Sequence, residues 1–274
     1  MSASFFRTRV IRAEDAALMP DAIRQMRAGV FEGLLVRDVY AADACARVVQ
    51  RLEAGDHGLV RMGFPAAMRA FFLGINLNLA GPDLGRYFEE APRFHDRLRA
   101  LFGEAPDLRT RVTGLLSTLD GGRPYGAAPG PGPDDTHMFT TLRAHLPGGF
   151  IPPHFDNEQA HRDSYRFITR QIGTDLFSFV LAFSQAEDGG ALEVFDRHHG
   201  GQTFRMVDGP LDASHLTLDG VPSVRFRLAP GEMILFNSGR FLHRVTPVIG
   251  AATRWTACSF MAESRSGDAV LCWG

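Results

Sequence analysis

The chain has 274 residues, of which 45% are hydrophobic and 22% are charged. This is the composition of an ordinary globular protein, so collagen-like, low-complexity and wholly disordered structures are excluded. The 29 Lys and Arg residues nearly balance the 31 Asp and Glu residues, and the formal net charge is −2. A chain so close to neutral has no overall attraction to phosphate backbones, so we expect no nucleic-acid partner.

The sequence shows no membrane, export or disulfide signal. It contains no run of about 18 apolar residues, so we expect no membrane span. The basic segment from Arg7 onward lacks the apolar stretch of a signal peptide, which predicts a cytoplasmic protein. Cys45, Cys258 and Cys272 are far apart and form neither a CxxC metal motif nor a disulfide framework.

Residues 1–110 are predicted to be a mostly helical flank. Apolar residues recur at helical spacing over residues 41–53, and Gly55 follows as a stop signal. A second long amphipathic helix is predicted over residues 83–102. The apolar, Gly-containing segment between them, residues 64–79, has no clear periodicity, so its state stays open.

From residue 111 onward, short β-branched and aromatic runs alternate with turn residues. We predict strands over residues 112–119, 138–146, 176–183, 191–195, 224–228, 233–236, 244–249 and 255–261. So many short strands favour an antiparallel sandwich or barrel. Residues 121–135 are rich in Gly and Pro and are predicted to be a loop, either a lid or a mobile insertion.

The most informative segment is Pro152-Pro-His-Phe-Asp-Asn157, in which His154 and Asp156 are two residues apart. On a strand, residues i and i+2 point to the same face, so an imidazole nitrogen and a carboxylate oxygen can converge on one ion. His243, which lies between two β-rich runs, is placed to join them on a returning strand. Two His and one carboxylate form the facial arrangement of non-haem Fe(II) oxygenases, which leaves open positions for cosubstrate and O2.

Arg254 and Thr256 are the third element of the candidate site. A guanidinium at this place in a barrel can bind a carboxylate bidentately, and Thr256 shares its face and adds a hydroxyl. The alternative for Arg254 is a structural side chain that bridges two strands.

Five motifs in sequence order resemble those of the Fe(II)/2-oxoglutarate-dependent oxygenase superfamily, and its prolyl-hydroxylase-like branch most. They are His154-x-Asp156, Gly189-Gly-Ala-Leu-Glu-Val-Phe195, Gly231-Glu-Met-Ile-Leu-Phe236, His243-Arg-Val-Thr-Pro247 and Arg254-x-Thr256. Each motif is modest alone, but the order and the gaps of all five together are specific. The match covers roughly residues 138–262.

The resemblance implies a mainly β fold with flanking helices, in which N-terminal helices cover a double-stranded β-helix (jelly-roll) core. It also implies one oxygenase domain over residues 1–274, with the helical flank over 1–110 and the catalytic core over 111–265. The implied cofactors are Fe(II), the cosubstrate 2-oxoglutarate and O2.

The same resemblance assigns roles to individual residues. It implies catalytic iron ligands at His154, Asp156 and His243, and it implies that Arg254, with Thr256, holds the far carboxylate of 2-oxoglutarate. His145 stands where relatives often carry a Tyr that contacts the cosubstrate. Its role stays open between a hydrogen-bond donor beside the site and a buried structural His.

The implied reaction is hydroxylation of an unactivated C–H bond, with release of succinate and CO2. Related amino-acid halogenases replace the carboxylate ligand by a small residue so that halide binds the iron. Asp156 retains that carboxylate, so hydroxylation is expected and halogenation is disfavoured.

The sequence says less about the substrate. Arg162 and Arg166 follow the His-x-Asp motif closely, and Arg86 lies in the helical region, so all three are candidates for binding an anionic small molecule, although solvated surface charge is the alternative. The chain is similar to bacterial hydroxylases of free or N-acylated (for example N-succinyl) amino acids, which predicts such a substrate. A homodimer stays open.

Three other functions compete with this one. The first is the same chemistry on a protein or peptide side chain, for which we find no basic or aromatic groove in the sequence. The second is a β-sandwich binding or scaffold protein with vestigial ligands, which intact ligands together with Arg254 argue against. The third is a zinc hydrolase, which leaves Arg254 without a task and supplies no obvious general base.

Overall fold

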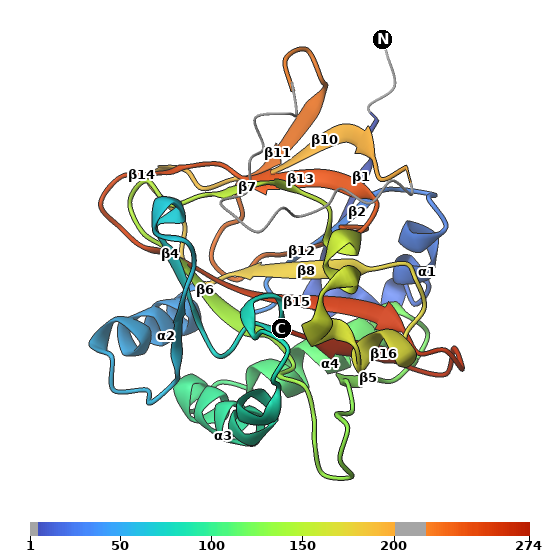
Figure 1. The fold of residues 1–274 in the computed structure, drawn as a ribbon. Helices are drawn as coiled ribbons and strands as arrows, with labels where there is room; N and C mark the ends of the chain where they lie inside the picture. The colour runs from blue at the N-terminus through green and yellow to red at the C-terminus, as the bar shows by residue number, and fades with distance from the viewer. Residues whose placement is uncertain (1–4, 201–217) are drawn as a thin grey trace.

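The computed structural model describes residues 5–200 and 218–274. Within them, two sheets of mainly antiparallel strands form a jelly roll, which confirms the predicted fold class (Figure 1). The core strands are β6 (Thr141–His145), β7 (Ile151–His154), β8 (Phe177–Ala182), β10 (Leu192–His198), β11 (Ser223–Phe226), β12 (Met233–Phe236), β13 (Phe241–Val245) and β15 (Arg254–Glu263).

Successive core strands change sheet, except that β10 and β11 both belong to the smaller sheet, and the two sheets lie face to face. The larger sheet contains the order β12-β8-β15-β6, and the smaller sheet has the order β11-β10-β13-β7. Because successive strand residues point to opposite faces, every second residue of β15 faces the smaller sheet. Its other residues, such as Trp255, Ala257 and Met261, are buried in the cluster that includes the helices.

The helices cover the outer face of the larger sheet, with α2, α3 and α4 below it in Figure 1. They are α1 (Ala22–Arg27), α2 (Ala42–Ala54), α3 (Gly85–Phe102) and α4 (Leu108–Leu119). Elsewhere in the described chain there are 3-10 segments at Ala13–Leu18, Ala66–Met68, Leu77–Leu79, Asp156–His161, Asp163–Tyr165 and Ile168–Arg170. The predicted helices over 41–53 and 83–102 are therefore confirmed as α2 and α3. Gly55 ends α2 in the left-handed region, at φ 81°.

The N-terminal region also contributes strands that the periodicity did not predict. They are β1 (Thr8–Arg12), β2 (Gly33–Arg37), β3 (Arg61–Gly63) and β4 (Ala70–Leu73). β2 pairs with β12 and β4 pairs with β6, so both edges of the jelly-roll sheet are extended by this region. The sequence left the secondary structure of residues 64–79 open. This segment contains β4, which is buried at all four positions, and the two neighbouring 3-10 segments.

The strand predicted over residues 112–119 is wrong, because this segment is the last two turns of α4. Val112, Leu115, Leu116 and Leu119 are buried, and their spacing is that of one helix face. Asp107 caps the helix by accepting a hydrogen bond from the Thr110 amide at 3.1 Å. The β-branched residues of the segment favoured a strand, but its apolar residues recur at helical spacing, and the segment is helical.

The remaining short strands pair at the edges of the fold. They are β5 (Tyr125–Ala127), β9 (Asp188–Gly189), β14 (Val248–Ile249) and β16 (Val270–Trp273). β5 lies inside the segment 121–135, which is therefore not wholly a loop, because Tyr125–Ala127 pair with β16 in parallel. No helix in the described part of the chain combines the length and the apolar character that a membrane span requires.

Candidate metal centre and cosubstrate pocket

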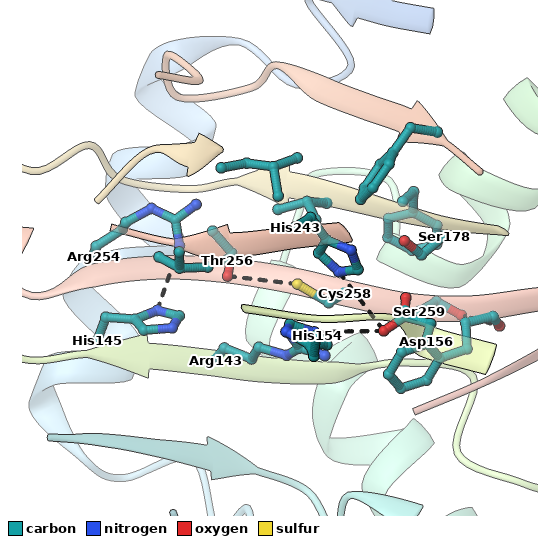
Figure 2. A pocket seen from close by; sticks show the side chains of 16 residues that line it. Arg143, His145, His154, Asp156, Ser178, His243, Arg254, Thr256, Cys258 and Ser259 are labelled. Atoms are coloured by element: carbon teal, nitrogen blue, oxygen red, sulfur yellow. Dashed lines mark hydrogen bonds and ion pairs between the residues drawn. The ribbon is translucent and has the colours of Figure 1, made fainter. Parts of the chain in front are cut away.

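Three side chains from separate elements converge between the two sheets. His154 ends β7, His243 lies on β13, and the two residues are paired across the antiparallel register. The Asp156 Oδ1 atom lies 3.6 Å from His154 Nε2 and 3.7 Å from His243 Nε2 (Figure 2). The ligand atoms of all three residues lie within 4.8 Å of one another, so they can share a single ion.

The local geometry of the His-x-Asp motif differs from the expected one. β7 ends at His154, and Asp156 is the first residue of a 3-10 segment, so the two do not lie on one strand as predicted. The Asp156 amide donates to the Ser238 carbonyl at 3.1 Å, which anchors the turn beside β13. The carboxylate therefore reaches the two imidazoles through a turn of the backbone rather than through strand alternation.

Both imidazoles are in the form that a metal requires. His154 Nδ1 lies 2.8 Å from the Pro152 carbonyl and His243 Nδ1 lies 2.9 Å from the Phe241 carbonyl, so each Nδ1 carries a proton and each Nε2 keeps its lone pair. Burial is the largest influence on both groups and lowers the pKa of each below its usual value, so both are neutral at pH 7. These fixed tautomers fit an N,O-liganded iron site.

A buried cation stands beside this centre. Arg254, at the start of β15, is paired across the register with His145 on β6, and its Nη1 donates to His145 Nδ1 at 3.4 Å. Burial lowers the pKa of Arg254 to about 10, so it stays charged at neutral pH. Since a guanidinium only donates, His145 accepts at Nδ1 and carries its proton at Nε2, which is buried and has no partner among the described residues. Arg254 and His145 thus offer donors suited to one carboxylate.

A cavity connects the two groups. Its lining includes His154, Asp156, His243, His145, Arg254 and Thr256, so the predicted ligands and the predicted cosubstrate residues face one space. The sequence analysis missed Arg143 and Cys258, which also line it. Arg143 stands two residues before His145 on β6, and strand alternation alone was a sufficient signal to find it.

The three predicted substrate arginines lie outside the lining of this cavity. Arg162 is half-buried and donates to the Gln159 side chain at 2.7 Å and to the Asn78 carbonyl at 2.6 Å. Arg166 and Arg86 are exposed, Arg166 beside the ring of its neighbour Phe167 and Arg86 on α3. A role in substrate binding stays a prediction for each of them.

Removing the guanidinium of Arg254 is expected to raise the requirement for 2-oxoglutarate. A hydrogen bond to a charged group contributes about 1.5–3 kcal/mol, so Arg254→Gln should raise the half-saturating concentration on the order of 10- to 100-fold. Metal affinity should not change, because Arg254 donates none of the candidate ligand atoms. Succinate release as a function of 2-oxoglutarate concentration measures the first effect, and calorimetric metal titration measures the second.

Arg254→Lys tests whether the loss comes from charge or from packing, since it keeps a cation in the same buried place. Arg61→Gln is the control, because Arg61 is a guanidinium that is exposed and lies outside the cavity. An unchanged 2-oxoglutarate requirement in Arg254→Gln would reject the proposed role of Arg254.

Comparison with known proteins agrees with this geometry. Residues 6–274 match the family model described as the carrier-protein-independent halogenase WelO5. No curated protein matches the sequence.

Solved structures of oxygenases share the fold. An N-substituted L-amino acid dioxygenase from Burkholderia ambifaria AMMD, in complex with alpha-KG, superposes with a TM-score of 0.57 at 15% identity, covering 92% of this chain and 90% of that one. A prolyl hydroxylase from Trichoplax adhaerens, in complex with a hypoxia inducible factor peptide fragment, gives a TM-score of 0.50 at 13% identity, with 90% and 89% covered. Likenesses at such low identity establish the fold alone.

Proposed function

The chain belongs to the family of the carrier-protein-independent halogenase WelO5, a family of Fe(II)/2-oxoglutarate enzymes, and on this premise we propose that it hydroxylates an unactivated C–H bond of a small carboxylate-bearing substrate. The substrate class that we favour is a free or N-acylated amino acid. In the balanced reaction, R–H, 2-oxoglutarate and O2 give R–OH, succinate and CO2.

The cofactors of the protein are Fe(II) and 2-oxoglutarate, and the chain's own residues fit them. The two neutral imidazoles and the Asp156 carboxylate suit a divalent iron, and Arg254 with His145 suits a dicarboxylate that reaches from one end of the cavity to the metal. When bound, the iron would activate O2, which is the oxidant and takes two electrons from 2-oxoglutarate, released as succinate and CO2, and two from the substrate C–H bond.

One observation carries the choice of hydroxylation over halogenation: the third ligand position is filled by a carboxylate. Asp156 Oδ1 lies near both imidazole Nε2 atoms, and the side chain is 3% exposed. A halide that binds the iron of a halogenase takes the place that a small residue leaves free at this position. With Asp156 present, that place is occupied, although the family model is named after a halogenase.

The protein's remaining tasks are orientation and exclusion of water. His154 and His243 are fixed by their Nδ1–H bonds to backbone carbonyls, so their Nε2 lone pairs keep one direction. Arg254 orients the far carboxylate of the cosubstrate. The cavity walls are mostly apolar, which keeps bulk water away from the reacting atoms, and they include Phe179, Val180, Leu192, Phe236, Val245 and Phe260.

The proposed substrate class rests on the lining of the cavity. An amino-acid derivative has an apolar body for these walls and a carboxylate for a cation. The fold likeness to the N-substituted L-amino acid dioxygenase is compatible with this class. The alternative is the same chemistry on a protein or peptide side chain. The fold likeness to a prolyl hydroxylase bound to a peptide is compatible with that alternative.

The function is tested by succinate release over a panel of free amino acids, N-acetyl and N-succinyl amino acids, and short peptides, with product mass read by mass spectrometry. We expect an increase of 16 mass units, the addition of one oxygen atom, in at least one small acid, with one succinate per product. Turnover confined to peptides would favour the alternative. Succinate release that no compound of the panel stimulates would contradict the proposed substrate class.

A further inference from the structure

The two glycines of the Gly189-Gly-Ala-Leu-Glu-Val-Phe195 motif have no role in the site described above. Gly190 directly follows β9 and is buried, and its backbone φ of 58° lies in the left-handed region that favours glycine. It also lies against the stem of Arg254. A Cβ atom at residue 190 would be 2.8 Å from Arg254 Cδ, whereas carbon atoms normally pack at about 3.5–4.0 Å.

The space beside Gly190 is closed by two further side chains. A Cβ at residue 190 would lie 3.3 Å from the Cβ of Ala186 and 3.3 Å from Cγ2 of Val248. Both distances are shorter than ordinary contacts between carbon atoms. A methyl group at this position would therefore be confined by three neighbours, of which the Arg254 stem is the nearest.

The backbone of Arg254 is fixed on both sides by one hydroxyl group. Ser184 Oγ donates to the Thr253 carbonyl at 2.9 Å and accepts from the Trp255 amide at 2.8 Å. Arg254 itself is held in the register of β15 against His145 on β6. If Arg254 is crowded, its side chain must therefore move, because its backbone is anchored.

The backbone of Gly190 is anchored as well. Its amide donates to the Pro247 carbonyl at 3.0 Å, and the amide of Ala191 donates to Thr246 Oγ1 at 2.9 Å. Since both backbones are held, a side chain at residue 190 would displace the Arg254 stem and the guanidinium that the stem carries.

We propose that Gly190 is the positioning residue for Arg254. Because Gly190 has no side chain, the Arg254 stem can pass beside it and place the guanidinium at the end of the cavity away from Asp156 (Figure 2). This inference rests on the proposed function, in which Arg254 orients the far carboxylate of 2-oxoglutarate. A side chain at residue 190 keeps the positive charge in the protein but moves it out of line with that carboxylate.

The test measures binding, so that it does not depend on turnover. The probes are 2-oxoglutarate and 2-oxopentanoate, which has the same chain length but a methyl group in place of the far carboxylate. Each is titrated calorimetrically into protein loaded with Fe(II) in the absence of O2. The ratio of the two dissociation constants measures the contact with Arg254, and the wild-type protein should prefer 2-oxoglutarate about 10- to 100-fold.

Gly190→Ala should reduce this preference about three- to tenfold, which is less than the loss expected for Arg254→Gln, because a displaced guanidinium still attracts the carboxylate. The affinities for Fe(II) and for 2-oxopentanoate should not change, since neither depends on Arg254. In an Arg254→Gln background, Gly190→Ala should have no further effect on the preference, because an effect that acts through Arg254 disappears with it.

Gly55→Ala is the matched control for backbone strain. Gly55 has a φ of 81°, and a Cβ there would meet no other atom of the described residues within 4 Å, so this variant should keep the full preference. Gly190→Asn separates strain from contact, because Asn adopts the left-handed conformation more readily than Ala but is larger. If the contact with Arg254 is the cause, Gly190→Asn should lose more of the preference than Gly190→Ala.

Gly190→Ala/Ala186→Gly is a second variant in case crowding prevents Gly190→Ala from folding. It removes the contact with the Ala186 methyl group, keeps the one with Arg254, and should lose the same part of the preference. An unchanged preference in these two variants would overturn the inference. So would a loss in Gly55→Ala as large as in Gly190→Ala, or a further loss in the Arg254→Gln background.

Failure of the proposed function gives a different result. If the preference depends on Gly190 and Arg254 but no small acid is hydroxylated, the proposed function fails and the inference stands. Hydroxylation together with an unchanged preference in Gly190→Ala would refute only the inference. A wild-type protein that binds both keto acids equally would remove the role of Arg254, and the inference with it.

Discussion

Replacement of His154 or His243 by alanine is expected to abolish Fe(II)-dependent turnover of 2-oxoglutarate. The two Nε2 atoms are the only imidazole lone pairs directed at the point beside Asp156 among the described residues that could hold a metal. Loss of a partner that merely orients a ligand already costs about 10- to 100-fold in metal affinity or activity. Loss of a ligand itself should therefore lower succinate release on the order of a thousandfold or more.

The measurement is succinate release together with the rise in melting temperature when Fe(II) is added. Binding to the native state raises its stability, so the ligand variants should lose this metal-dependent rise. Their fold should persist, because within residues 5–200 and 218–274 each imidazole hydrogen-bonds only to a backbone carbonyl two residues away. His161→Ala is the control, since His161 is exposed and ends the same 3-10 segment that begins at Asp156. Full turnover in either ligand variant would show that the assigned centre is wrong.

Replacement of Asp156 by glycine is expected to lower hydroxylation and, in addition, to let the site bind a halide. The substitution removes the carboxylate between the two imidazoles and leaves their positions intact, since the Asp156 amide that bonds to the Ser238 carbonyl belongs to the backbone. Hydroxylation should fall at least about 100-fold, because one ligand to the iron is lost. The vacated position should admit chloride or bromide, so 2-oxoglutarate turnover should become halide-dependent.

Product mass spectrometry with and without chloride or bromide measures this change, using whichever substrate of the panel the wild-type protein hydroxylates. Asp163→Asn is the matched control, because Asp163 is an exposed carboxylate only seven positions away and should leave both rate and product unchanged. Undiminished hydroxylation by Asp156→Gly would remove Asp156 from the ligand set. Equal inactivity with and without halide would leave Asp156 as a ligand but would contradict the expected halide site.

The sequence predicted which residue types form the site, but not the backbone conformation that positions them. His154, Asp156, His243 and Arg254 were found from residue type, spacing and order, because a metal and a dicarboxylate restrict which side chains can serve them. The backbone conformation between His154 and Asp156 was not predicted, since a turn and a strand both allow these two side chains to converge. Arg143 was overlooked although strand alternation places it on the same face as His145, two residues further along β6.

The amino-acid sequence by itself determined the elements whose apolar period is unambiguous, such as α2, α3 and the strands β6, β8, β10, β11, β12 and β15. Only the tertiary structure decided that β2 joins the sheet beside β12, and that residues 112–119 form part of a helix. Strand pairing between distant segments depends on backbone hydrogen bonds, which any residue makes, so no local pattern specifies it. The tertiary structure also placed Arg143 and Arg254 in one cavity, because side chains far apart in the chain meet only through the register of β6 against β15.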